Sequence, residues 1–468
     1  MIFVLNTLDY RTPTTKGTYM KIWNVFVLSI IFIISIASSL LAYDLLNPLS
    51  GVQLHGFISQ GYVFSKSHNF LFDDIDHGSF EFNELGVTVS KKLNDRLHLG
   101  IQFFSRDQGN IGNNDLVIDW AYADYHYKDY LGIRVGKLKM PLGFYNETRD
   151  IDILRTCIFL PQSAYLEYYR DVLGGLHGIG FYGNLPLDWG SDISYQLLAG
   201  TLKIDQNGGV TTLLNNEASI ETHPLLNIHS YSVNNCINGM IVFSPFPGLK
   251  LGSSFIQTAT KVKADLNPDL MKTFARDMDY ALLYYKGLID PDSIMLDRIE
   301  KGTLAMFAGS PLEAEVDNVL AFMHSVELSI DRLVIMMEYY NYTYDIKLKI
   351  PDSLTLFDND FFTLGYYANI VYRFSDMVET GIYYSVLQDN GWDQSGDRFA
   401  KKGEQRHQTW LKDLSLSIRF DVNDSWTFKL ENHWMNGTAF LMHANNPDKR
   451  YDLGQYWQMF AAKMTFHF

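Results

Sequence analysis

Apolar and polar side chains alternate along most of the chain, in segments of about nine to twelve residues. Between Leu414 and Phe420, apolar residues occupy the even positions, and Ser415, Ser417 and Arg419 lie between them. Side chains of a β-strand point alternately to the two faces of a sheet, so a period of two predicts strands whose faces meet different environments. The segment length also matches that of a tilted strand that crosses a bilayer.

The junctions between these segments alternate between short and long. We predict about sixteen strands, near residues 51–64, 79–90, 96–106, 117–128, 131–139, 176–184, 190–200, 233–245, 248–260, 317–330, 332–346, 361–374, 376–389, 408–421, 423–435 and 455–468. Every second junction is a tight turn, as at 128–130, 331–332 and 375–376. Short turns on one rim and long loops on the other are typical of outer-membrane barrels, and an even strand number brings both termini to the short-turn rim.

A membrane environment favours a closed sheet, because backbone groups in lipid must find hydrogen-bond partners within the protein. A soluble β-sandwich or propeller is the alternative, but it does not require long and short junctions to alternate. Four tryptophans near strand ends fit interfacial girdles: Trp410, Trp426, Trp434 and Trp457. The sequence therefore predicts an all-β transmembrane antiparallel β-barrel with short periplasmic turns and long extracellular loops.

Composition excludes several other classes of protein. The formal net charge of −15 argues against nucleic acid as a partner, because a protein that binds nucleic acid needs a basic surface. A mean hydropathy of −0.08 argues against a bundle of membrane helices, whose spans would raise the average. Together with an aromatic share of 15%, it suits a barrel in which only every second residue faces lipid. Only two cysteines occur, Cys157 and Cys236, and no Cys or His spacing indicates a metal site or a cofactor.

The first 42 residues are predicted to be a leader rather than part of the barrel. Val25 to Ala42 forms an apolar run after Lys21 and ends in small residues, as in a secretory signal peptide. An anchoring helix is the alternative, because the run approaches spanning length. Translation is expected to start at Met20, and residues 43–468 are expected to form the barrel.

The chain ends in a segment whose even positions, from Tyr456 to Phe468, are almost all apolar or aromatic. We expect these positions to face outer-membrane lipid and lipopolysaccharide. The terminal aromatic residue resembles the signature with which outer-membrane proteins end. This resemblance implies recognition by the barrel-assembly machinery and localisation in a bacterial outer membrane.

The segment from Leu131 to Thr156 contains the pattern R-x-G-K-x-K-x-P, followed by a long connection with an Arg-Asp pair. This pattern resembles the phosphate-selective porin O and P family and, more broadly, uncharacterised sixteen-stranded porins. HGIGFYGNLP at 177–186 resembles the strand that returns from the constriction loop in such porins. The resemblance implies that residues 141–175 form a loop that folds into the barrel. Independently of the resemblance, the long junction at 261–316 is predicted to be a large extracellular loop, in which Asn267 and Pro268 suit the start of a helix near 268–286.

Charged residues on this segment are candidates for the pore lining and constriction: Arg134, Lys137, Lys139, Glu147, Arg149, Asp150, Asp152, Arg155 and Arg170. Rings of fixed charge in a narrow lumen select ions by sign and size. Strand parity turns Arg134 inward and turns Lys137 and Lys139 outward, towards lipid. A bulge at Gly136 would turn both lysines into the lumen. Alternatively, both lysines point outward but lie above the bilayer. A solvated external loop with surface ion pairs is the alternative to an inward loop.

These features predict a passive diffusion channel for small hydrophilic solutes or ions, with a homotrimer as one expected assembly. The candidate charges are of mixed sign and form no run of arginines, which argues against tight capture of phosphate. A substrate-specific channel for an anion such as phosphate remains an alternative. Another is an outer-membrane barrel enzyme of the lipase or protease type, although the sequence contains no G-x-S-x-G and we assign no catalytic residues.

Overall fold

The computed structural model describes residues 51–109, 111–217, 219–220, 223–224, 226–233, 235–267, 309–351, 354–401, 405–442, 445–446 and 453–468. The chain divides into two units, 1–52 and 53–468, and only residues 51 and 52 of the first are described. The predicted signal peptide and the predicted helix at 268–286 therefore lie outside the described residues. No helix in the described part of the chain is long and apolar enough to span a membrane.

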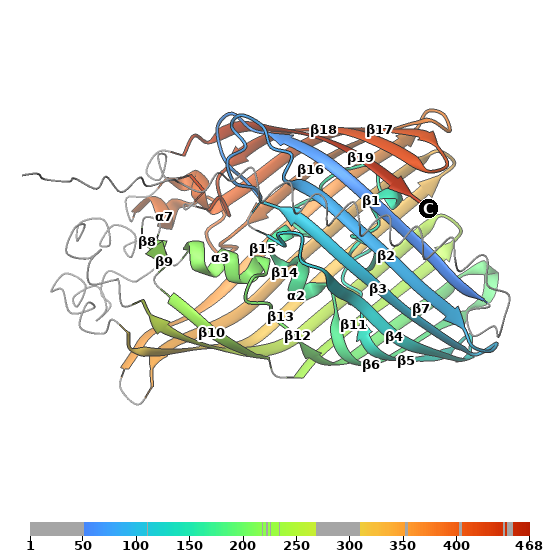
Figure 1. Cartoon of the computed structure of the whole chain (residues 1–468), viewed down its shortest axis with the longest axis horizontal. Helices are drawn as coiled ribbons and strands as arrows, with labels where there is room; N and C mark the ends of the chain where they lie inside the picture. Colours follow the sequence, from blue (N-terminus) through green and yellow to red (C-terminus); the bar gives the residue numbers. More distant parts are fainter. Residues whose placement is uncertain are drawn as a thin grey trace, which may run out of the picture. The chain divides into compact units, whose positions relative to one another are not determined.

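Sixteen antiparallel strands close into a barrel, which confirms the predicted fold (Figure 1). They are β1 (Val52–Phe64), β2 (Phe82–Lys92), β3 (Leu97–Gln108), β4 (Val117–Lys128), β5 (Leu131–Leu138), β6 (Leu176–Pro186), β7 (Asp192–Leu202), β11 (Asn235–Phe246), β12 (Leu249–Leu266), β13 (Pro311–Ile330), β14 (Leu333–Ile350), β15 (Leu354–Arg373), β16 (Val378–Gln388), β17 (Trp410–Asn423), β18 (Trp426–Gly437) and β19 (Tyr456–His467). Pairing of β1 with both β2 and β19 closes the ring.

The largest differences from the predicted strands lie towards the long-loop rim. β10 (Leu226–Val233), in a region predicted to be a loop, pairs with β12 beyond the end of β11. β12 to β15 contain 18 to 20 residues each, about twice the length that crosses a bilayer. The ladder of β12 and β13 pairs as far as Asp265 and Pro311, so both ends of the expected loop 261–316 are strand.

Short turns join the strands at the other rim, as the sequence predicts (Figure 1). β13 and β14 are joined by only two residues, and Asp331 adopts a positive φ of 48° there. Aspartate tolerates this conformation better than most side chains, so the DR turn suits a tight hairpin.

The two faces of each strand have the environments that parity predicts. Met337 and Ile382 on the outward face are 52% and 45% exposed, whereas Lys429 and Lys463 on the inward face are 0% and 2% exposed. A closed sheet that is apolar outside and charged inside is suited to lipid. Trp457 corrects one expectation, because it points inward and packs against His68 and Phe70 rather than joining an interfacial girdle.

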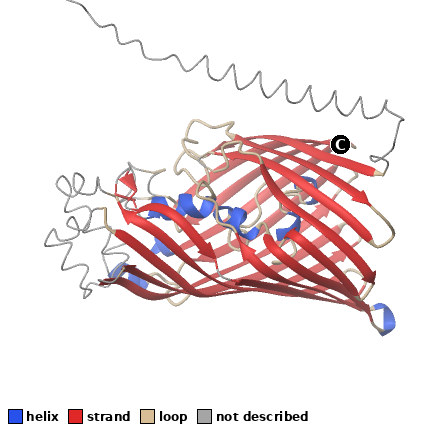
Figure 2. Ribbon diagram, turned by 60° about the horizontal axis from the view of Figure 1, so that its bottom comes forward, coloured by secondary structure: helices blue, strands red, loops and turns tan. Residues whose placement is uncertain are grey.

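Apolar side chains and short helices fill much of the barrel interior. One buried cluster brings together Phe70 and Phe72 of the connection after β1, Phe159 of the connection between β5 and β6, Leu441 of the connection after β18, and Trp457 of β19. A second cluster packs residues 138–165 against the opposite wall. In the described part of the chain, η1 (Asn146–Thr148), η2 (Asp152–Leu154), η3 (Glu167–Tyr169) and α2 (Arg170–Leu173) lie in the connection between β5 and β6 (Figure 2). The remaining helices are η4 (Asp188–Gly190) in the exposed turn between β6 and β7, α3 (Gly209–Glu217) after β7, and α7 (Asp397–Lys401) and η6 (Arg406–Thr409) between β16 and β17.

Candidate functional site

The connection between β5 and β6, residues 139–175, lies inside the barrel and is called the inner loop below. Its backbone bonds to the wall: the Phe144 amide donates to Glu338 at 2.8 Å, and the Ile158 amide donates to Glu431 at 2.6 Å. Wall side chains that hydrogen-bond to the inner loop come from most of the circumference: Gln196, Asn238, Ser254, Glu338, Glu379, Arg419 and Lys429. These contacts hold the inner loop across the lumen.

Asp152 anchors the inner loop to the last two strands. Its carboxylate lies 3.1 Å from the Lys429 ammonium and 3.4 Å from the Lys463 ammonium. The Thr465 hydroxyl donates to the same carboxylate at 2.9 Å, and Arg155 lies 3.7 Å away. Two wall cations and one loop cation therefore converge on a single buried anion.

Glu167 forms the centre of a second anchor, on the side of β2 and β3. It accepts hydrogen bonds from Arg106 at 2.6 Å, Arg149 at 3.0 Å and Arg170 at 3.0 Å. Arg170 also donates to Glu84 at 2.7 Å, and Glu84 in turn pairs with Lys463. The two anchors are thus one continuous network that crosses from β3 to β19 through the inner loop.

The network determines the ionisation of the loop carboxyls. Burial alone would raise the pKa of Asp152, but Lys429, Lys463 and Arg155 outweigh it and hold that pKa well below its usual range. Glu167 behaves in the same way, because three arginines overcome its burial and lower its pKa. Burial lowers the pKa of Arg149 to about 10, so this guanidinium remains charged at neutral pH.

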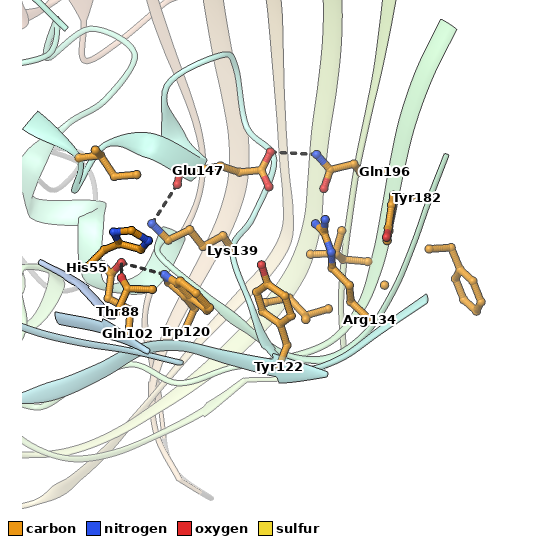
Figure 3. Close-up of a pocket in the computed structure, with 15 residues that line it drawn as sticks. His55, Thr88, Gln102, Trp120, Tyr122, Arg134, Lys139, Glu147, Tyr182 and Gln196 are labelled. Atoms are coloured by element: carbon orange, nitrogen blue, oxygen red, sulfur yellow. Dashed lines mark hydrogen bonds between the residues drawn. The ribbon is translucent and has the colours of Figure 1, made fainter. Parts of the chain in front are cut away.

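A cavity of about 380 Å³ lies between the inner loop and the wall formed by β1 to β7 (Figure 3). Its lining combines aromatic, amide, charged and aliphatic side chains: His55, Thr88, Gln102, Trp120, Tyr122, Arg134, Leu138, Lys139, Glu147, Ile151, Phe181, Tyr182, Gln196 and Leu198. This volume falls within the range typical of small-molecule sites, about 300–1,000 Å³. The inner loop therefore leaves solvent-sized space along one side of the lumen.

Charges of both signs line this cavity. The Lys139 ammonium donates to the Glu147 carbonyl at 2.9 Å (Figure 3). It also pairs with Asp150. The Glu147 carboxylate accepts a hydrogen bond from the Gln196 amide at 2.9 Å, and burial raises the pKa of Glu147. Arg134 donates from Nε to Asp124 at 3.0 Å. Each cation therefore already has an anionic partner.

The predicted site residues occupy three different places. Arg134, Lys139 and Glu147 line the cavity. Arg149, Asp150, Asp152, Arg155 and Arg170 are buried, between 2% and 8% exposed, and take part in the pairing that holds the inner loop. Lys137 does not line the cavity, and its ammonium donates to the Ile118 carbonyl at 2.6 Å.

The two lysines of the motif differ because β5 ends between them. Pairing with β4 and β6 runs through Gly136 without a register shift, so the bulge considered at this glycine is wrong. Gly136 has a φ of +141°, and a Cβ there would lie 2.1 Å from the Ala121 carbonyl oxygen, which explains the need for glycine. Lys137 keeps its outward parity near the end of β5, and Lys139 turns into the lumen only after pairing stops.

Several contributors were not among the predicted site residues. Glu84, Lys429 and Lys463 provide wall charges to the network, and inward parity on their strands is the signal that could have found them. Glu167 could not be distinguished by sequence from other acidic residues of the loop. Within the described residues, no group of three His, Cys, Asp or Glu side chains could hold a metal ion.

No protein-family model and no curated protein matches the chain. Solved structures with a similar barrel include the outer-membrane channel DcaP of Acinetobacter baumannii, with a TM-score of 0.48, 9% identity and coverage of 89% of this chain and 97% of that chain. The anion-selective porin from Comamonas acidovorans has a TM-score of 0.47 and 10% identity, over 89% of this chain and 99% of that one. OmpT of Vibrio cholerae has a TM-score of 0.46 and 10% identity, over 89% and 97%. Likeness at this level supports no inference about the solute, which must come from this chain's own lumen.

Proposed function

We propose that this chain is an outer-membrane channel through which small hydrophilic solutes diffuse passively. The observation that carries the proposal is the inner loop, which is held across the lumen by buried ion pairs and leaves a cavity beside β1 to β7 that charged and amide side chains line in part. An apolar outer surface places the barrel in lipid, and the closed sheet separates its interior from lipid. The inner loop narrows the path, so the residues that face the cavity control permeation.

The charges that face the cavity favour weak rather than strict ion selectivity. Arg134 and Lys139 are the arginine and the lysine of the cavity lining, and each is paired with a carboxylate. A channel specific for phosphate would need several cations free to contact the anion, in bidentate geometry where possible. The paired state of Arg134 and Lys139 therefore favours a general channel over the phosphate-specific alternative.

Single-channel recording tests the proposal. Purified, heat-modifiable protein in a planar lipid bilayer is expected to give stepwise conductance, and a reversal potential measured across a salt gradient reports its selectivity. Glu147→Gln removes a negative charge from the cavity and should shift the reversal potential towards anion selectivity. Lys139→Gln should shift it in the opposite direction.

Lys137→Gln is the matched control, because Lys137 lies two residues from Lys139 but outside the cavity lining. Its reversal potential should equal that of the unaltered protein. Folded protein that never shows conductance steps would refute the channel. Equal shifts for all three variants would instead show that the cavity is not the selective part of the path.

A further inference from the structure

We propose that the connections after β1 and after β18 together form an apolar stopper, which closes one side of the lumen at the long-loop rim and so limits the size of the solutes that pass. The stopper consists of residues 68–75 and 438–442 together with Asn445 and Asn446. Its two parts lie side by side (Figure 1). This inference rests on the proposed function, because it adds a second barrier to the path that the inner loop narrows.

The stopper packs its apolar side chains against one continuous part of the barrel wall. Its buried apolar residues are no more than 3% exposed: Phe70, Leu71, Phe72, Ile75, Ala439, Leu441 and Met442. They share one cluster with wall residues of neighbouring strands: Leu387 of β16, Leu411 of β17, Met435 of β18, Trp457 of β19, Val63 of β1 and Phe82 of β2. The stopper therefore excludes water from the side of the lumen that β16 to β19, β1 and β2 form.

Three aromatic rings join the stopper to the wall and to the inner loop. The Phe72 ring of the stopper lies 5.2 Å from the Phe82 ring and 6.0 Å from the Phe159 ring, edge to face in both cases. Phe82 and Phe159 stack with centroids 5.2 Å apart. The three side chains are 1%, 4% and 5% exposed. Apolar constrictions of this kind block a pore because water leaves them.

The charged network that holds the inner loop lies directly beneath these rings. The Lys463 ammonium lies 5.1 Å from the centroid of the Phe82 ring, and the His433 ring lies 6.0 Å from the Phe159 ring. On β18 and β19, the contacts of the stopper lie towards the long-loop rim and the charged residues towards the short-turn rim. The stopper therefore covers the network, whose ion pairs are stronger without water than with it.

Two asparagines hold the two parts of the stopper to each other. The Asn69 backbone amide donates to the Asn446 side-chain oxygen at 2.9 Å, and the Asn446 side-chain amide donates to the Asn69 carbonyl at 3.0 Å. The Asn69 side chain donates to the Asn445 carbonyl at 2.7 Å and accepts a hydrogen bond from the Ile75 amide at 3.0 Å. We call this pairing the asparagine clasp.

The backbone of the stopper adopts conformations that it would not keep without the clasp and the packing. Leu71, Asp74 and Phe440 have positive φ values of 63°, 49° and 64°. Leucine and phenylalanine rarely occupy the left-handed region, and such residues persist only where the surroundings fix them. We therefore expect the stopper to loosen as a unit once the clasp is broken.

The stopper and the cavity serve different parts of the lumen. The residues that line the cavity come from β1 to β7 and the inner loop, and none of them belongs to the stopper. Solutes are thus confined to the cavity side while the stopper is in place. Its release would hydrate the charged network and open a second route beside β16 to β19.

Conductance and polymer exclusion of the full-length protein in a planar bilayer test this inference. Asn446→Ala breaks the clasp and also removes a hydrogen bond to the Met442 carbonyl at 2.9 Å. Conductance should rise by about twofold or more, because a second route adds to the first. Polyethylene glycols that are too large to enter the unaltered channel should lower the conductance of the variant. Phe72→Ala should act in the same direction.

Asn432→Ala is the matched control, because Asn432 has the outward parity of β18, where it pairs with Leu416. Its conductance and exclusion limit should equal those of the unaltered protein. Unchanged values in both Asn446→Ala and Phe72→Ala, with the proteins still heat-modifiable, would overturn the stopper. The absence of any conductance steps from folded protein would instead overturn the channel.

Hydrogen exchange on the unaltered protein is a test that needs no variant. The amides of Asn69 and Ile75, which donate to asparagine side chains inside the stopper, should exchange as slowly as the paired amides of β18. Exchange as fast as that of an exposed turn would show that the stopper does not exclude water, and would overturn it.

A double variant locates the added current. Glu147→Gln should shift the reversal potential less in the Asn446→Ala background than in the unaltered protein, because part of the current then avoids the cavity. An undiminished shift would show that all current still passes the cavity, and would overturn the second route.

Discussion

The Lys429 ammonium of β18 lies 3.1 Å from the Asp152 carboxylate of the inner loop, and the two side chains are 0% and 1% exposed. One partner belongs to the barrel wall and the other to the loop that crosses the lumen. Removing either partner leaves the other charge buried with fewer compensating groups, which costs more than the loss of a surface ion pair. The pair therefore couples the position of the inner loop to the stability of the barrel.

Asp152→Asn should lower the free energy of unfolding by about 3–5 kcal/mol, the range for breaking a buried ion pair. The amide keeps the shape of the side chain but leaves Lys429 and Lys463 without their shared anion. Denaturant unfolding in detergent micelles, followed by tryptophan fluorescence, measures the change. Single-channel conductance should also rise if the inner loop leaves the wall.

Glu327→Gln is the control for this substitution. Glu327 pairs with Lys250 at 2.8 Å beside a short turn, where the lysine is 52% exposed. An exposed pair of this kind contributes about 0–1 kcal/mol. A loss in Asp152→Asn no larger than that in Glu327→Gln would show that the inner loop does not depend on its buried charges.

Acidification should affect Glu147 before it affects the loop anchors. The lowered pKa values of Asp152 and Glu167 mean that their contribution to stability is fully present above the unfolded carboxyl pKa, about 4, and is lost as pH falls through the lower folded values. Burial shifts the pKa of Glu147 in the opposite direction, so this carboxyl takes up a proton at a higher pH.

Reversal potentials recorded between pH 8 and pH 4 should therefore drift towards anion selectivity while the unfolding midpoint stays nearly constant. The drift should be smaller in Glu147→Gln, which has no carboxyl at this position to titrate. A parallel fall of stability and selectivity over this range would mean that the inner loop undocks rather than that one cavity residue is neutralised.

Strand positions could be predicted from sequence because lipid and the lumen impose a strict period of two. Leu414, Leu416 and Ile418 face lipid, and the serines between them face the interior, as the alternation requires. β10 was missed because it pairs only at the end of β12, beyond the length that a bilayer demands. Strand segments outside the membrane do not have one face in lipid, so their sequences need not alternate between apolar and polar residues with a period of two.

Roles within the inner loop were much harder to predict. Arg149 and Glu147 lie two residues apart and both are charged, yet Arg149 is held by Glu167 and Glu147 faces the cavity. Which role each takes depends on partners 18 and 49 residues further along the chain. A single sequence carries no local signal for such pairings. The alternation does indicate that Lys429 and Lys463 point into the barrel, and a cation that becomes buried there needs an anionic partner.

Gly365→Ala should displace the inner loop from β15. A Cβ at this glycine would lie 1.9 Å from the Ser163 carbonyl oxygen, where the Ser163 hydroxyl also donates to the Tyr366 carbonyl. Backbone atoms cannot yield as a flexible side chain can, so we expect a loss of about 1–3 kcal/mol, typical of overpacking. Denaturant unfolding measures this loss, and single-channel recording should show a larger or noisier conductance.

Gly239→Ala is the comparison variant. Gly239 lies on the outward parity of β11, and an added Cβ would come within 2.7 Å of the Phe255 ring, a side chain that can move. This variant should keep its conductance unchanged. If Gly365→Ala behaves like Gly239→Ala, the contact between Ser163 and β15 does not position the inner loop.

Adjacent lysine substitutions on β2 distinguish the lipid face from the lumen. Thr88 lines the cavity, so Val87 beside it has the outward parity and pairs with Phe103 of β3 near the middle of both strands. Val87→Lys places an ammonium in lipid and should lower the free energy of unfolding by about 2–4 kcal/mol. Thr88→Lys places the same charge in water and should cost little stability, but it should move the reversal potential towards anions. Unfolding in phospholipid vesicles and bilayer recording measure the two effects, and equal destabilisation of both variants would contradict the assignment of the two faces.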